Sequence, residues 1–280
     1  MSRLSVAYIV KNEIENLPES IRMIRELVDE IIVVDTGSKD GTWEWIKSRK
    51  DIISKQIKWK DDYAEARNVS LSLCTKPWIL VIDADEWIDK QYFEFIRAAI
   101  EVNFNYYGYY MTIHNFITSP FWDPHPQIMY GKAVRLFRNR NSIRYDGCVH
   151  NQLTGIDEIL KNTLDVAVYH FQYRERFNYK EKAKRNLALL EKREIKTGRN
   201  FNTCVWHGDI YKRLWLWFQE DENLETAVDW FKMALTYPPD TPGKVMIINK
   251  VIKQCEVILN GKHENNKVQE KLKPAMASGN

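Results

Sequence analysis

Two short apolar runs, each followed at once by an aspartate, constrain the fold of this chain more than any other feature. Residues 31–34 precede Asp35, and residues 78–82 precede Asp83. Neither run alternates with polar residues, so both are expected to be strands buried on both faces of a sheet. Leu4–Val10 is expected to be a further strand of the same kind.

The segments between these strands have helical character. In residues 16–28 apolar side chains recur at helical spacing, and Pro18 lies in the first turn. Residues 36–41 are typical of a turn, Thr42 is expected to cap the helix that follows, and Tyr63–Leu73 is predicted to be another helix. Strands that alternate with helices predict an α/β fold with a mostly parallel, doubly wound sheet.

Beyond residue 100 the pattern changes twice. Residues 106–168 hold alternating and aromatic-rich pieces, which predict a mixed or antiparallel extension of the sheet. Within them, residues 119–127 hold three prolines and predict a loop that could cover a substrate. From about residue 177 the chain is predicted to be helical. The expected parts are an α/β domain over residues 1–175, a helical domain over 176–260 and a flexible tail over 261–280.

The helical part carries a spacing typical of a tetratricopeptide repeat. The matching positions of its two helices are Gly208, Tyr211, Ala227, Phe231, Ala234 and Pro239. The gap between the two helices is longer than the repeat permits. An ordinary helical hairpin explains the pattern equally well, and both interpretations remain open.

Charge and cysteine content argue against several classes of protein. There are 41 Lys and Arg against 38 Asp and Glu, a formal net charge of +3, which disfavours a dedicated nucleic-acid-binding protein. The four cysteines form no C-x-x-C pair, which favours free thiols in a reducing compartment. The chain starts with a short apolar strand rather than a signal peptide, and no stretch approaches the roughly 18 apolar residues of a membrane span. We expect a soluble, cytoplasmic protein.

The sharpest chemical feature is the sequence Asp83-Ala84-Asp85-Glu86, called the acidic turn below. Ligands of open α/β sheets bind where the carboxyl ends of the strands meet, so Asp35 and Asp83 are both expected at that edge. Two carboxylates two residues apart can serve one hard divalent cation, Mn²⁺ or Mg²⁺, which commonly bridges diphosphate oxygens. The turn therefore predicts a metal-dependent nucleotide site.

These motifs together resemble those of a family-2 glycosyltransferase with a GT-A fold. The matching segments, in the family's order and spacing, are VAYIVKNE at 6–13, IIVVDTGSKDGT at 31–42, AEARN at 64–68 and WILVIDADE at 78–86. Residues 135–138 (RLFR) and 147–150 (GCVH) resemble a subgroup that includes lipopolysaccharide-core-type glucosyltransferases and bacteriocin peptide S-glycosyltransferases. Several members carry helical or tetratricopeptide-like C-terminal parts. The resemblance implies that residues 1–175 are a nucleotide-sugar-binding catalytic domain.

Carried over residue by residue, the resemblance implies a donor site and a metal site. The donor site, for a nucleoside-diphosphate sugar and most simply a UDP-sugar, is expected to include Ile9, Val10, Asn12, Glu13, Asp35, Thr36, Arg67, Asp83 and Ala84. Thr36 stands where many relatives have a second Asp. A Mn²⁺ or Mg²⁺ ion is expected on Asp85, with His150 as a further ligand.

The resemblance leaves the catalytic base open. An inverting enzyme needs a group that takes the proton of the acceptor. The Glu that usually follows the His in this subgroup is Asn151 here, so that residue cannot serve. Glu86, next to the expected metal ligand, is the first candidate, and Asp146 is the second. His170, at the end of an expected strand, is expected to have a structural role. Candidates for the acceptor side are Trp122, His125 and Arg138.

The expected function is therefore the metal-dependent, inverting transfer of a hexose from a nucleoside-diphosphate sugar to a peptide Cys or Ser or to a glycan. The expected partners are this donor and acceptor, without nucleic acid, and a homodimer is left open. One alternative is a degenerate glycosyltransferase domain that acts as a binding module through its helical half. Another is a nucleotidyltransferase, although Lys11-Asn12-Glu13 is not the glycine-rich loop expected there. A Rossmann oxidoreductase is disfavoured because no G-x-G-x-x-G follows the first strand.

Overall fold

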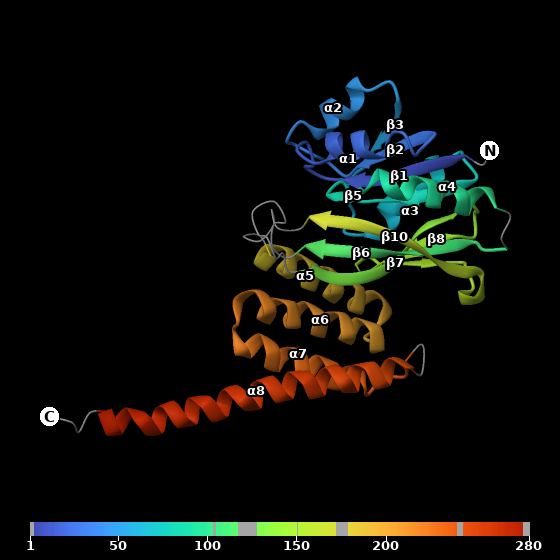
Figure 1. The fold of residues 1–280 in the computed structure, drawn as a ribbon. Coiled ribbons are helices and arrows are strands. Elements are labelled where there is room, and N and C mark those ends of the chain that lie inside the picture. Colours follow the sequence, from blue (N-terminus) through green and yellow to red (C-terminus); the bar gives the residue numbers. More distant parts are fainter. Residues whose placement is uncertain are drawn as a thin grey trace. The chain divides into compact units, whose positions relative to one another are not determined.

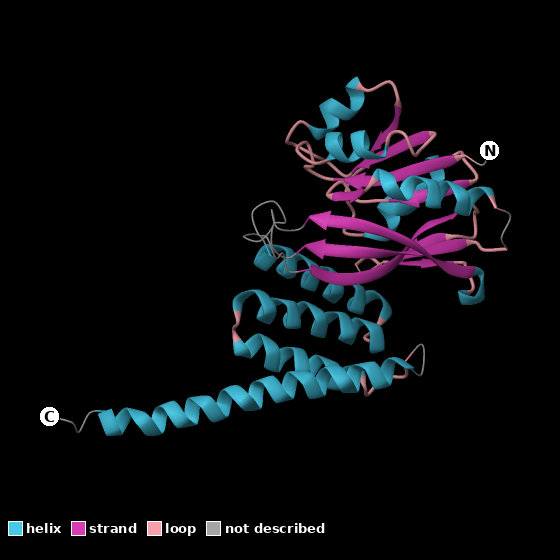
Figure 2. Ribbon diagram, in the orientation of Figure 1, coloured by secondary structure: helices cyan, strands magenta, loops and turns pink. Residues whose placement is uncertain are grey.

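A computed structural model describes residues 3–102, 105–116, 128–149, 151–171, 179–239 and 243–276. The chain divides into two compact units, Met1–Arg176 and Phe177–Asn280. Figure 2 shows that the described strands all belong to the first unit and that the second unit consists of helices joined by loops.

The first unit is built on a mixed sheet with the strand order β3-β2-β1-β4-β7-β6-β10-β5 (Figure 1). Its parallel half contains β1 (Leu4–Val10), β2 (Glu30–Asp35), β3 (Ile52–Gln56) and β4 (Trp78–Val81). Every residue of β2 and β4 is buried, as their continuous apolar sequences predicted. The doubly wound α/β fold is thus confirmed for this half.

The other half of the sheet is partly antiparallel, which confirms the predicted mixed extension. β7 (Ile128–Arg138) pairs antiparallel with both β4 and β6 (Gly108–Phe116). β10 (Lys161–Phe171) runs parallel to β6, and β5 (Glu86–Ile88) pairs antiparallel with β10. A small second sheet joins β8 (Arg144–Asp146) to β9 (Gln152–Thr154). The proline-rich loop of residues 119–127 lies outside the described residues.

Helices cover both faces of the sheet. Along β4, Leu80 belongs to a core shared with α1 (Leu17–Ile24), α2 (Thr42–Ser48) and α4 (Phe93–Glu101). Its neighbours Ile79 and Val81 belong to a second core shared with α3 (Tyr63–Leu73) and β8. Successive side chains of a strand point to opposite faces, so the two cores lie on the two sides of the sheet. Short 3₁₀ turns occur at Lys90–Tyr92 (η1) and Glu158–Leu160 (η2).

The second unit contains α5 (Tyr179–Thr197), α6 (Phe201–Phe218), α7 (Asp221–Ala234) and α8 (Gly243–Met276). A capping box starts α6: the Asn200 side chain accepts the Thr203 N–H (3.0 Å), and the Asn200 N–H donates to the Thr203 hydroxyl (3.1 Å). Among the described residues, no helix combines the length and the apolar composition needed to cross a bilayer.

Gly208 of α6 lies directly against the ring of Phe231 of α7. A Cβ atom added at Gly208 would come within 2.6 Å of that ring, and Phe231 is 1 % exposed. Two positions of the repeat-like pattern are therefore in contact, and the glycine permits the close approach of the two helices.

Gly208→Ala is expected to lower the free energy of unfolding of the helical unit by about 1–3 kcal/mol, because the added methyl group overpacks a buried contact. Gly261→Ala is the matched control, since this glycine of α8 has no atom within 4 Å of its added Cβ. In an exposed helix such a change is neutral or stabilising. Urea denaturation followed by far-UV circular dichroism compares the two variants, and equal stability would contradict the contact.

Candidate active site

The acidic turn lies where the parallel strands end. Just after β4, the Ile82 N–H still donates to the Ala7 carbonyl of β1 (3.4 Å). The chain then reverses, because the Glu86 N–H donates to the Asp83 carbonyl (3.0 Å), and it continues as β5. Strands hold the turn at both ends, so the backbone positions its carboxylates.

Asp83 is held between two guanidinium groups. Arg67 Nη2 lies 2.7 Å from Oδ1, and Arg135 Nη1 lies 3.9 Å from Oδ2. The two arginine side chains are only 11 % and 12 % exposed. Burial acts to raise the pKa of Asp83, but the charges of Arg67 and Arg135 outweigh it and hold the pKa well below its usual range. Asp83 is therefore ionised and fixed in position.

Glu86 is buried rather than presented to a substrate. Its side chain is 1 % exposed; Oε1 accepts from Arg135, and Oε2 accepts the Asp83 N–H (2.9 Å). Burial raises the pKa of Glu86. A general base must reach the proton that it removes, so this geometry does not fit the expected role of Glu86 as the base. The carboxyl group instead positions the acidic turn.

Arg135 links the two carboxylates of the turn because it occupies an irregularity of β7. Leu136 pairs with Tyr109 of β6, and Val134 pairs with Tyr110, so Arg135 is the extra residue of a β-bulge. Such a residue escapes the strict alternation of a strand. Sequence reasoning found Arg135 only within a motif and gave it no role, because a bulge depends on the partner strand.

His170 lies beside Asp85, where we had expected only a structural role. His170 Nε2 is 3.0 Å from Asp85 Oδ2, and Nδ1 is 2.9 Å from Asn115 Oδ1. The strand register places Glu86, His170 and Asn115 opposite one another, so their side chains share a face. Burial acts to lower the pKa of His170, but the hydrogen bond and charge of Asp85 outweigh it and raise the pKa. Both neighbours are acceptors, which suits the imidazolium form.

Asp85 and His170 form a donor pair that fits a divalent cation. They offer one carboxylate oxygen and, once a cation has displaced the Nε2 proton, one imidazole nitrogen. This set suits Mn²⁺ better than Mg²⁺, which prefers oxygen ligands. The described residues contain no group of three or more His, Cys, Asp or Glu that could hold a metal ion. The expected ligand His150 lies outside them. The pair thus fits an ion whose coordination is completed by substrate and water.

Asp35 lies at the end of β2, but its carboxylate faces the loop that follows. It is 0 % exposed and accepts hydrogen bonds from the Gly37 N–H (2.9 Å), the Ser38 N–H (3.1 Å) and Gln56 Nε2 (2.8 Å). The Ser38 hydroxyl also donates to it. Asp35 therefore orders this loop through its own hydrogen bonds.

The end of β1 is hydrogen-bonded to the same loop. The N–H and the hydroxyl of Thr36 both donate to the Val10 carbonyl (2.9 and 3.1 Å). Asn12 has a left-handed backbone (φ 58°), and its N–H donates to Ser38 Oγ (2.8 Å). Ile9 is half-buried. These expected donor-site residues therefore lie together with Asp35 at the carboxyl edge of the sheet.

Thr42 does not cap α2, contrary to our prediction. The N-cap is Gly41, whose φ of 97° is a conformation that favours glycine. Thr42 is the first helical residue, and its hydroxyl accepts the Glu13 N–H (2.8 Å). The Thr42 hydroxyl therefore holds the chain segment that follows β1, and it does not cap the N-terminus of α2.

α3 presents Arg67 to Asp83. Its N-cap residue, Asp62, accepts a backbone N–H of the first turn (3.0 Å). The Arg67 guanidinium lies over the Tyr145 ring at 5.4 Å, and Asn68 makes hydrogen bonds of 2.9 and 2.8 Å to the Tyr145 backbone. These contacts fix α3 and β8 to each other and define the direction of the arginine.

Asp146 is exposed to a possible ligand, whereas Ala84 is buried. Asp146 follows Tyr145 on β8 and is exposed, beside a hollow of about 560 Å³ that Asn68 also lines. Ala84 is 3 % exposed, so it offers little side-chain surface to a ligand. The expected acceptor residues Trp122 and His125 lie outside the described residues.

Arg138 is not brought to the acidic turn. It pairs with Trp78, the first residue of β4, and its guanidinium lies over that indole ring at 4.6 Å. The acidic turn follows the other end of β4. Arg138 therefore lies beside the amino end of β4, away from the acidic turn, and it is not part of the proposed site.

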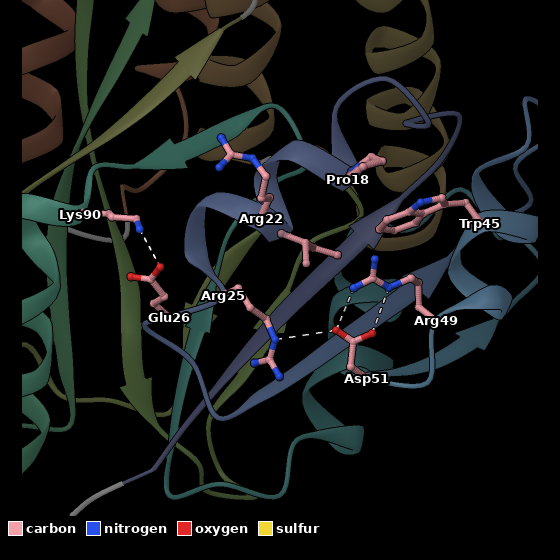
Figure 3. A pocket seen from close by; sticks show the side chains of 9 residues that line it. Pro18, Arg22, Arg25, Glu26, Trp45, Arg49, Asp51 and Lys90 are labelled. Carbon is pink, nitrogen blue, oxygen red and sulfur yellow. Dashed lines mark hydrogen bonds and ion pairs between the residues drawn. The ribbon is translucent and has the colours of Figure 1, made fainter.

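Another hollow, of about 490 Å³, lies between α1 and the segment after α2 (Figure 3). No residue of the acidic turn lines it. Its cations are paired with acids: Arg49 with Asp51 (3.0 Å), and Lys90 with Glu26 (2.7 Å). We assign this hollow no part in the active site.

Comparison with known proteins identifies the class. Residues 5–155 match the family described as "Glycosyl transferase family 2". The chain belongs to this glycosyltransferase family. The matched region contains β1 to β4 and the acidic turn, and the resemblance noted from the sequence motifs is thus confirmed.

Several relatives have similar sequences. The TPR repeat-containing protein Synpcc7942_0270 of Synechococcus elongatus is 33 % identical over 54 % of this chain and 35 % of its own length. The SPbeta prophage-derived glycosyltransferase SunS of Bacillus subtilis is 25 % identical over 91 % of this chain and 58 % of its own length. The lipopolysaccharide core biosynthesis glycosyltransferase LpsC of Rhizobium meliloti is 30 % identical over 51 % and 53 %. The chain thus spans 35–58 % of the length of these relatives.

Arg135→Met would leave Glu86 buried without its cation, so we expect the free energy of unfolding to fall by about 3–5 kcal/mol. Arg135→Met/Glu86→Gln removes the unpaired charge and is expected to recover part of this loss. Arg22→Met is the control, because Arg22 forms an exposed pair with Glu19 (2.6 Å) and should leave stability almost unchanged. Urea denaturation measures all three. Similar losses in Arg135→Met and Arg22→Met would count against the buried pair.

Proposed function

We propose that this chain transfers a hexose from a nucleoside-diphosphate sugar, most simply a UDP-sugar, to an acceptor with inversion at the anomeric carbon. The observation that carries the proposal is the acidic turn, with Asp83 held between two arginines at the carboxyl edge of the parallel strands. This edge is where open α/β sheets bind ligands. Membership of glycosyl transferase family 2 supports the reaction type.

The charges of the turn support a requirement for a divalent cation. Its three carboxylates face two guanidinium groups, and His170 is neutral when it binds a metal ion, so the acidic turn then carries about one negative charge by itself. A diphosphate adds negative charge that this balance leaves uncompensated. A bound Mn²⁺ or Mg²⁺ would neutralise the charge that develops on the leaving nucleoside diphosphate.

Asp85 and His170 are the described residues that would hold the cation. Asn115 orients the imidazole through Nδ1, and a metal-ligating histidine usually donates its other ring N–H in this way. Arg67, fixed by Asp83 and Tyr145, would bind on the nucleotide side, where its buried charge favours an anionic ligand. The loop ordered by Asp35 would support the base and the ribose.

The acceptor is proposed to be a peptide Cys or Ser or a glycan hydroxyl. Asp146 is the remaining candidate base, since Glu86 is buried and bonded on both oxygens. Support comes from the exposure of Asp146 and from the hollow of about 560 Å³ beside it, which leaves room for an acceptor group. Its position on β8, next to the tyrosine that contacts Arg67, links it to the donor side.

Thermal melting tests donor and metal binding together. UDP-, GDP- and dTDP-sugars are compared with and without Mn²⁺. At least one donor is expected to raise the melting temperature in the presence of Mn²⁺, since a ligand at a hundred times its Kd stabilises the folded state by about 2.7 kcal/mol. A chain that no donor stabilises, with or without metal, would contradict the proposed function.

Two variants distinguish the contribution of the metal ion to UDP affinity from that of the protein alone. Asp85→Asn and His170→Ala are expected to remove the Mn²⁺-dependent gain in UDP affinity, measured by titration calorimetry, and to keep the weaker metal-free binding. His114→Ala is the control, because it lies next to Asn115 on β6 and points to the other face. Full Mn²⁺ dependence in His170→Ala would remove His170 from the metal site.

A further inference from the structure

Hydrogen bonds cross the carboxyl ends of β1, β2 and β3 as one continuous chain. The Asn12 N–H donates to Ser38 Oγ (2.8 Å), the Ser38 hydroxyl donates to Asp35, and Gln56 Nε2 donates to Asp35 Oδ2 (2.8 Å). Gln56 is the last residue of β3, and the parallel register places it beside Asp35. The chain of bonds thus has a buried carboxylate in its middle and a side-chain amide at its β3 end.

Asp35 and Gln56 differ in what a ligand can reach. Asp35 is 0 % exposed, and its oxygens already accept from Gly37, Ser38 and Gln56. A new bond to a ligand would have to break one of these contacts. Gln56 is exposed on the edge strand of the sheet. The amide is therefore the group of this pair that a nucleotide base can contact directly.

Asp35 also determines which way the amide points. A carboxylate can only accept, so the Nε2 side of Gln56 must face it. Turning the amide over would place Oε1 against the carboxylate, which loses the hydrogen bond and brings two acceptors together. The second Nε2 hydrogen and Oε1 remain for a ligand, as one donor and one acceptor in a fixed order.

We propose that Gln56, oriented by Asp35, selects uracil as the base of the donor nucleotide. This inference rests on the proposed function and names the residue that determines its base specificity. Uracil presents the acceptor O4 next to the donor N3–H, which complement Nε2–H and Oε1. Cytosine has an amino donor and an unprotonated ring nitrogen at these positions, so the fixed amide meets donor with donor and acceptor with acceptor. Unpaired polar groups in a site discriminate strongly against the wrong ligand.

Titration calorimetry of UDP and CDP, each with Mn²⁺, tests the inference on the full chain. The wild type is expected to bind UDP at least about tenfold more tightly than CDP, a difference of about 1.4 kcal/mol. Gln56→Ala is expected to bring the two affinities within about threefold, mainly by weakening UDP. Lys55→Ala, at an exposed neighbouring position of β3, is the matched control and should keep the wild-type ratio.

Asp35→Asn provides a second test that leaves Gln56 in place. An asparagine can donate as well as accept, so the amide of Gln56 is free to turn over, and the preference for UDP over CDP is expected to fall. The melting temperature of each variant verifies that it is folded.

The outcomes separate the inference from the proposed function. A Gln56→Ala variant that keeps the wild-type UDP:CDP ratio overturns the inference and leaves the donor function standing. Wild-type protein that binds GDP or CDP more tightly than UDP also overturns the inference about Gln56 and leaves the donor function standing. Wild-type protein that binds no nucleoside diphosphate overturns both.

Discussion

Ion pairs between two largely buried arginines and the acidic turn hold that turn in place, and the geometry of the proposed site depends on them. Arg135 contacts both Asp83 and Glu86, and Arg67 contacts Asp83 from α3. Burying such charges is costly, and their attraction compensates only when geometry and additional hydrogen bonds are good. Here the Asp83 N–H supplies such a bond to Glu86. The ion pairs join three segments that are distant in the sequence, so the turn is positioned before any ligand arrives.

Much of the fold could be predicted from the sequence, because burial leaves a direct trace in it. Strands covered on both faces appear as continuous apolar runs, and the aspartates that follow mark the carboxyl edge of the sheet. The predicted donor residues from Ile9 to Thr36 lie together at that edge because parallel strands end there. The motif AEARN assigned Arg67 to the expected donor site, and the structure pairs it with Asp83, another residue of that set, at 2.7 Å.

The rest of the site could not be predicted, because it depends on how distant strands pair. His170 reaches Asp85 through the register of β10 with β5 and β6, which no local pattern reveals. Arg135 reaches the turn through a bulge that exists only relative to β6. Glu86 looked available in the sequence because it is charged and next to the expected metal ligand. Its burial follows from the strand that begins at this residue.

The same contrast appears at the nucleotide edge. The aspartate that the motif marks as a ligand contact is the buried centre of a hydrogen-bonded loop, and an unremarkable glutamine on β3 carries the accessible amide. Hydrogen-bonding capacity explains the different roles of the two residues. The Asp35 carboxylate accepts backbone N–H groups and orders its loop, whereas the Gln56 amide offers both a donor and an acceptor to a ligand. Gly208 in the helical unit is a similar example. The sequence shows only a glycine, and the structure shows that the Phe231 ring packs where a Cβ atom would lie.

The most direct test of this account is a crystal structure of the chain with UDP and Mn²⁺. The account predicts the cation between the diphosphate and the side chains of Asp85 and His170, Arg67 on the nucleotide side, and the uracil beside Gln56. Nucleotide bound away from the acidic turn, in the hollow between α1 and α2 for example, would contradict it. So would a cation that contacts neither Asp85 nor His170.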